Sequence, residues 1–92
     1  MKQNKPTPEE LMNVLEAQTS TLHITHIGKM AWLYVMLGDE SYQEVVDKAK
    51  SQLETNFKRV MRGWDAEKRE NEINEMLDAT QLYQSIIRMR GE

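Results

Sequence analysis

The sequence predicts an all-α fold, an elongated antiparallel bundle of three long helices that is completed by oligomerisation. Apolar residues recur at steps of three and four through most of the chain, which is the spacing of one face of a helix. The one stretch with a rough alternation, residues 19–28, has no second strand-like segment to pair with. With 92 residues, 39% hydrophobic residues and no cysteine, we expect a flexible tail over residues 1–6 and one domain over residues 7–92 without disulfide bonds.

The first helix is expected over about residues 8–37. Thr7 can cap its start and Glu10 completes a capping box, since each side chain can bond the other residue's backbone amide. β-Branched residues are concentrated in residues 19–28 and lower the helix propensity, so we expect the helix to bend or split there. Gly38 provides a stop, because glycine tolerates the left-handed conformation that often ends a helix.

Two further helices are expected over about residues 41–62 and 65–90. Ser41 and Glu44 form a second capping-box pattern, and Asp65 can cap the third helix. The second helix has the most regular apolar stripe, which comprises Tyr42, Val45, Val46, Ala49, Leu53, Phe57, Val60, Met61 and Trp64. The stripe of the third comprises Ile73, Met76, Leu77, Thr80, Tyr83, Ile86 and Ile87.

Helix length and apolar content together predict self-association. At about 1.5 Å per residue, the second and third helices would be roughly 33 and 39 Å long, whereas a compact protein of this size is about 30 Å across. Residues 30–37 are all apolar, so a helix there has no polar side to expose. We therefore expect a partner chain to cover an interface comprising Met30, Trp32, Leu33, Tyr34, Met36, Leu37, Leu82, Ile86 and Met89.

Two histidines are weak candidates for metal binding. His23 and His26 lie three residues apart and would share one face of a helix, as paired imidazole ligands do. No third ligand lies nearby in the same segment, and the usual Glu-x-x-His arrangement is absent. The favoured interpretation is that both are polar surface residues, and no metal site is predicted.

One basic cluster could bind an anion or an acidic partner. Lys58, Arg59 and Arg62 precede Trp64, and two more basic residues follow the turn. Cationic side chains also stabilise the C-terminal end of a helix, and nearby glutamates could neutralise part of this charge. Both interpretations of the cluster remain open at the level of sequence.

The predicted function is that of a small non-enzymatic protein–protein interaction module, such as a regulator, inhibitor or assembly adaptor, acting as a homo-oligomer. No catalytic residue constellation and no cofactor motif emerge, and thiol chemistry is excluded by the lack of cysteine. The alternative is a protein that binds a small anionic ligand or a nucleotide between protomers. Nucleic-acid binding ranks lower, because a net charge of −3 does not favour it. No apolar run approaches the length of a membrane span, so we expect a cytoplasmic protein without a membrane partner.

Overall fold

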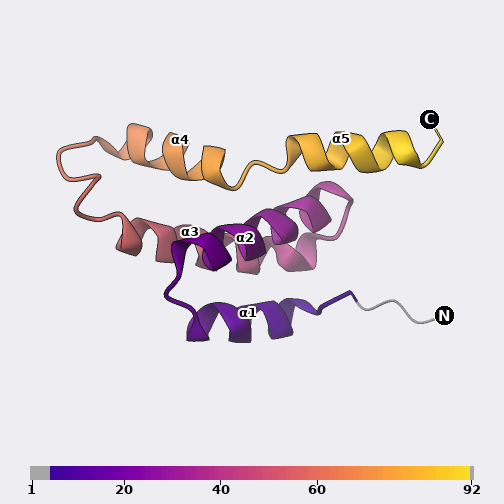
Figure 1. Cartoon of the computed structure of the whole chain (residues 1–92), viewed down its shortest axis with the longest axis horizontal. Coiled ribbons are helices and arrows are strands. Elements are labelled where there is room, and N and C mark those ends of the chain that lie inside the picture. The colour runs from indigo at the N-terminus through magenta and orange to yellow at the C-terminus, as the bar shows by residue number, and fades with distance from the viewer. Residues whose placement is uncertain (1–4, 92) are drawn as a thin grey trace.

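A computed structural model describes residues 5–91, and every regular element in this range is helical (Figure 1). The elements are α1 (Pro8–Ala17), α2 (Thr21–Met36), the short 3-10 helix η1 (Glu40–Tyr42), α3 (Gln43–Asn56), α4 (Ala66–Met76) and α5 (Thr80–Met89). The all-α prediction is confirmed for this part of the chain. The prediction of three long helices is corrected, because each expected helix is divided or shortened.

The first expected helix, residues 8–37, is split at residues 18–20. The capping box at its start is confirmed, since the amide of Glu10 donates to Thr7 Oγ1 over 3.1 Å and the amide of Thr7 donates to Glu10 Oε1 over 3.0 Å. Gln18 and Ser20 both have extended backbone angles, and Ser20 caps the new helix α2. The split therefore falls at the N-terminal edge of the segment in which a break was predicted.

The second expected helix, residues 41–62, is shorter at both ends. Asp39 replaces Ser41 as the capping residue, because its Oδ1 accepts hydrogen bonds from the Ser41 amide at 3.1 Å and the Ser41 hydroxyl at 2.5 Å. At the far end, the Asn56 side chain donates to the Thr19 carbonyl over 3.1 Å and thereby joins the end of α3 to the start of α2. Residues 57–63 then continue in turns rather than in a helix.

The third expected helix, residues 65–90, is divided at residues 77–79. Asp65 caps α4 as predicted, with the amide of Lys68 donating to its Oδ1 over 2.8 Å. Asp78 interrupts the helix because its Oδ1 accepts from the amide of Thr80 at 2.9 Å and from the Thr80 hydroxyl at 2.6 Å. A short polar side chain bonded in this way offers the backbone an alternative to the helical ladder.

The core lies between α2 and α3, which have the most extensive contact of any two elements. Gly28, in the middle of α2, is buried, and its lack of a side chain lets Ala49 of α3 and Leu77 approach the α2 backbone closely. α1 and α4 flank this pair, and the molecule measures 48 × 29 × 20 Å (Figure 1). The buried apolar residues are Leu11, Leu15, Ile24, Ile27, Ala31, Tyr42, Val45, Val46, Ala49, Leu53, Met61, Ile73, Leu77 and Ala79.

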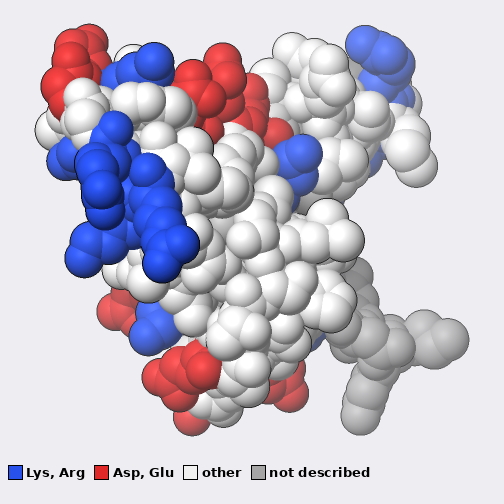
Figure 2. All heavy atoms as spheres, turned by 60° about the vertical axis from the view of Figure 1, so that its left-hand side comes forward, with Lys and Arg blue, Asp and Glu red and all other residues white. Residues whose placement is uncertain are grey.

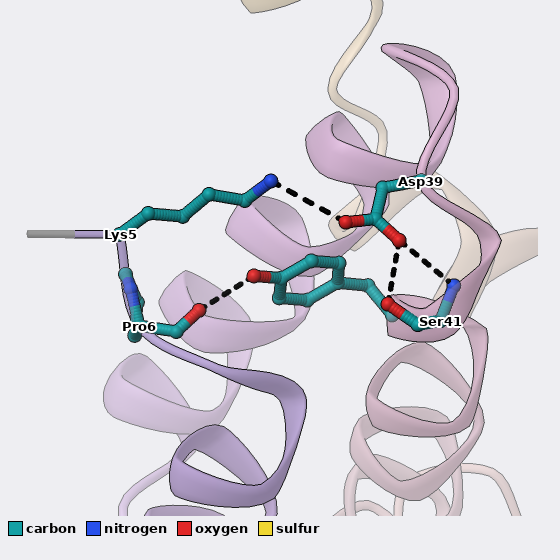
Figure 3. A network of polar contacts seen from close by, with 5 residues as sticks. Lys5, Pro6, Asp39 and Ser41 are labelled. Atoms are coloured by element: carbon teal, nitrogen blue, oxygen red, sulfur yellow. Dashed lines mark hydrogen bonds and ion pairs between the residues drawn. The ribbon is translucent and has the colours of Figure 1, made fainter. Parts of the chain in front are cut away.

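The start of the chain includes the segment of residues 1–6 that was expected to be a flexible tail. Residues 1–4 lie outside the described residues, but Lys5 and Pro6 both contact the folded domain. The Tyr42 hydroxyl donates to the Pro6 carbonyl over 2.6 Å, and Lys5 Nζ lies 3.4 Å from Asp39 Oδ2 (Figure 3). These contacts hold the chain that precedes α1 against the junction between α2 and α3.

Candidate functional site

The basic side chains after α3 line an open hollow of about 650 Å³. The turns of residues 57–63 hold it in shape, since the amide of Met61 donates to the Phe57 carbonyl over 2.9 Å and the amide of Trp64 donates to the Met61 carbonyl over 3.0 Å. The buried Met61 side chain anchors these turns to the core, and Gly63, with φ of 88°, reverses the chain toward α4. We name this site the basic hollow, and its lining comprises Glu54, Thr55, Lys58, Arg59, Met61, Arg62, Gly63 and Arg69.

Positive charge dominates the basic hollow, and Figure 2 shows it as a continuous group of Lys and Arg atoms on one side of the molecule. Arg69 is half-buried, and its Nη1 donates to the Trp64 carbonyl over 2.9 Å, which fixes the guanidinium in the wall of the hollow. Lys58, Arg59 and Arg62 are exposed. Their side chains make no hydrogen bond to any residue in the described range.

The expected neutralisation of this cluster by neighbouring glutamates is not observed. Within residues 5–91 the only ion pair joins Lys5 to Asp39, at the other end of α3. Glu67 and Glu70, which sequence spacing placed near the cluster, are exposed on α4 and form no ion pair with it in that range. The four cations of the hollow are therefore balanced only by Glu54 among its lining residues.

Trp64, which the sequence grouped with the basic cluster, does not line the basic hollow. It lines a separate apolar pocket of about 140 Å³, and Lys68 Nζ lies 4.5 Å from the centre of its ring. The other residues of this pocket are Phe57, Val60, Met61, Glu72, Ile73 and Met76. The predicted anion-binding set thus divides between the basic hollow and an apolar pocket, and Met61 lines both.

A second surface is formed by α5, none of whose side chains is buried. Leu82 is 46% exposed and Met89 is 83% exposed, while Tyr83, Ile86 and Ile87 are half-buried. The helix contacts α2, and beyond α4 it extends along the longest axis of the molecule (Figure 1). An apolar stripe with so little cover within its own chain is a candidate interface.

The apolar residues of α2 that were assigned to the interface lie close to the core instead of projecting freely. Met30, Trp32, Leu33, Tyr34, Met36 and Leu37 are all half-buried, and Trp32 and Tyr34 pack against the core cluster. Within one chain, α2 contacts α1, α3, η1 and α5. The expected bundle of three helices would have left only two other helices to cover it. Lys50 Nζ also lies 5.3 Å from the Trp32 ring centre, which covers part of the indole.

Within residues 5–91, the histidine pair and the acidic side chains do not assemble a metal site. His23 and His26 are both exposed, and His23 Nδ1 lies 3.1 Å from Gln18 Oε1, a hydrogen bond within the same chain segment. In the range that the structure describes, no group of three or more histidine, aspartate or glutamate side chains could hold a metal ion.

A polar network at the start of the chain was not predicted from the sequence. Tyr42 is buried, which raises the pKa of its phenol, while the nearby Lys5 opposes that shift. The hydrogen bonds from Ser41 hold the pKa of the Asp39 carboxyl below its ordinary value (Figure 3). Lys5 Nζ also lies 4.7 Å from the ring centre of Tyr34. The network joins the two ends of the α2–α3 connection to the segment before α1, which is a structural role.

Comparison of the chain with protein-family models, with curated proteins and with solved structures finds no match. Among the helices described within residues 5–91, none is long and apolar enough to cross a membrane.

Proposed function

We propose that the protein is a non-enzymatic interaction module, such as a regulator, inhibitor or assembly adaptor, that pairs through α5 with a second copy of itself. The observation that carries this proposal is that α5 is strongly amphipathic but buries no side chain within its own chain. Exposed apolar area of this kind favours association, because removing it from water lowers the free energy by about 25 cal/mol per Å².

The spacing of the apolar residues supports a helix-to-helix contact. Leu82, Ile86 and Met89 follow one another at steps of four and three, which is the spacing of the apolar seam in a coiled coil. In an antiparallel pair centred on Gln84, Leu82 of one copy lies opposite Ile86 of the partner subunit. The surface is then self-complementary, as a two-fold symmetric interface requires.

The charges at the two ends of α5 favour the same antiparallel arrangement. Arg88 and Arg90 lie at its C-terminal end, and Asp78 lies two residues before its N-terminal end. The pairing centred on residue 84 brings Arg90 opposite Asp78 of the partner subunit. The Asp78 carboxylate can attract an arginine at neutral pH, and hydrogen bonds from Thr80 hold the pKa of this carboxyl below its ordinary value.

The size of the surface predicts a weak and reversible dimer. A ten-residue helix is about 15 Å long and cannot supply by itself the roughly 1,200 Å² that stable interfaces usually bury. Half-buried residues of α2, which contacts α5, would widen the surface. We therefore expect association in the micromolar range, which suits a module that exchanges partners.

Sedimentation velocity across the micromolar range tests the proposal. We expect the wild-type protein to shift from monomer to dimer with concentration, and Leu82→Glu or Met89→Glu to remain monomeric, because each places an unpaired charge in the apolar seam. The matched control is Val60→Glu, which changes an equally apolar residue, 63% exposed, near the other end of the molecule. A wild-type protein that stays monomeric throughout, or a Val60→Glu variant that dissociates as fully as Leu82→Glu, would contradict it.

A further inference from the structure

The basic hollow is held open by the fold independently of any ligand. Its floor is the turn segment of residues 57–63, which is fixed by backbone hydrogen bonds and by the buried side chain of Met61. One of its walls is Arg69, whose guanidinium is fixed by the hydrogen bond to the Trp64 carbonyl. The floor and this wall are therefore ordered before a ligand binds, and the exposed side chains of Lys58, Arg59 and Arg62 are the groups that lose conformational freedom on binding.

The last turn of α3 contains no basic residue, and the end of this helix is stabilised by backbone hydrogen bonds. The amides of Phe57 and Lys58 already donate to the carbonyls of Leu53 and Thr55, over 3.0 and 3.3 Å. No described hydrogen bond joins the side chains of Lys58, Arg59 or Arg62 to a carbonyl at this end. Four cations around one cavity, with a single carboxylate among the lining residues, repel one another and attract an anion.

The chemistry of the cations indicates which anion fits. Three of the four are arginines, and a guanidinium presents a planar set of N–H donors that matches two oxygens of one phosphate group. A cavity of about 650 Å³ is much larger than one phosphate ion and lies in the range of ligand sites, roughly 300–1,000 Å³. We infer that the basic hollow binds an oligophosphate anion, either inorganic or the phosphate chain of a nucleotide.

The position of Trp64 narrows this inference further. Its ring lines the separate apolar pocket and is therefore not available to stack on a base held in the basic hollow. Among the lining residues of the hollow there is no aromatic side chain. Recognition accordingly rests on the phosphate chain, and a nucleoside should add little affinity. The residues that line the basic hollow all belong to one chain, whereas the sequence analysis considered a ligand site between protomers.

Isothermal titration calorimetry with sodium tripolyphosphate, in magnesium-free buffer at low salt, tests the inference. We expect saturable binding of one tripolyphosphate per chain, affinity for ATP within about threefold of that value, and a steep loss of affinity between about 50 and 200 mM salt, where screening shortens the range of charge interactions. Binding of ATP without binding of tripolyphosphate would overturn the inference. So would equal affinity for an acetylated oligoglutamate of matched charge, since that result would indicate attraction of any polyanion.

Substitutions in the basic hollow provide the second arm of the test. We expect Arg59→Ala and Arg62→Ala each to weaken tripolyphosphate binding about five- to tenfold, because each removes charged hydrogen bonds to the ligand. Glu54→Gln should strengthen binding by removing the carboxylate that opposes it. Lys48→Ala, which removes one positive charge from α3 outside the hollow, is the matched control and should bind as the wild type does. Circular dichroism verifies that all four variants are folded, and unchanged affinity in both arginine variants would overturn the assignment.

Discussion

Substitution of Gly28 by alanine tests the close packing at the centre of the fold. A Cβ atom at this position would lie 2.8 Å from Ala49 Cβ and 2.8 Å from Leu77 Cδ2. Both neighbours are completely buried, and alanine has no rotamer through which it could move away. Relief therefore requires α2 and α3 to separate by several tenths of an ångström or more.

Two opposing effects determine the sign of the change in stability. Alanine is favoured over glycine in a helix interior by about 1 kcal/mol, which would stabilise α2. Overpacking of a dense core costs about 1–3 kcal/mol, and two contacts far below van der Waals distance place this site in the upper part of that range. We expect Gly28→Ala to lower the free energy of unfolding by about 1–2 kcal/mol, which for a domain of this size lowers Tm by about 5–15 °C.

Chemical and thermal unfolding followed by circular dichroism measure this change. The double variant Gly28→Ala/Ala49→Gly provides the matched control, because it removes the Cβ that would collide with the new one. We expect the two substitutions to be coupled by about 1 kcal/mol or more, so that the double variant is more stable than the sum of the single variants implies. A Gly28→Ala protein that is more stable than the wild type would refute the close approach of α2 to α3.

Three further predictions concern the polar contacts of the chain. Tyr42→Phe removes the hydrogen bond to the Pro6 carbonyl and should lower the free energy of unfolding by about 1 kcal/mol, measured by urea titration; an unchanged midpoint would show that this contact adds nothing. Asp39 has a lowered pKa in the folded state, so its contribution to stability is present above the ordinary value of 3.8 and is lost as the pH falls through the lowered folded value. Ser41→Ala should raise the pKa of Asp39 in an NMR titration, and an unaltered titration curve would contradict the assigned cause. Asp65→Ala should destabilise the protein by about 1 kcal/mol through loss of the cap on α4, whereas Asp65→Asn, which can still accept the Lys68 amide, should have little effect.

Two of the helix starts were predictable because their signals are local. The capping box at Thr7 and Glu10 and the cap at Asp65 each depend on side chains within four residues, and the structure contains both. The positive φ angles at Gly38 and Gly63, 109° and 88°, likewise follow from the lack of a side chain. Such features need no knowledge of the tertiary structure.

The helix breaks could not be placed in the same way, because they depend on competition between nearly equal alternatives. Ser41 and Asp39 can both cap the helix that follows, and the sequence favoured the capping-box pattern over the aspartate that bonds two residues ahead. Asp78 interrupts a segment in which apolar residues recur at helical spacing without a gap. Leu77, directly before Asp78, is fully buried. Gly28, the last residue of the segment in which a bend or split was expected, lies in a continuous helix and permits contact with α3.

The composition of the candidate sites likewise could not be predicted fully from the sequence. The sequence grouped Trp64 with the basic residues because they are neighbours in the chain, but they line different pockets. Arg69, one of the two basic residues after the turn that the sequence grouped with this cluster, lines the basic hollow because α4 folds back beside α3. Proximity in the sequence therefore predicted the cations of the basic hollow but not the pocket that Trp64 lines.

The basic hollow and the exposed stripe of α5 should act independently. The hollow lies at the connection between α3 and α4, whereas α5 lies beyond the far end of α4, along the longest axis of the molecule (Figure 1). A dimer that pairs through α5 leaves both hollows open and presents two anion sites.

Coupling between two sites is reciprocal, so tripolyphosphate can strengthen the dimer only if dimerisation equally strengthens tripolyphosphate binding. We expect neither effect: the dimer constant from sedimentation should be the same with and without tripolyphosphate, and Leu82→Glu should bind it as tightly as the wild type. A difference of more than about threefold in either measurement would show that the two surfaces are linked.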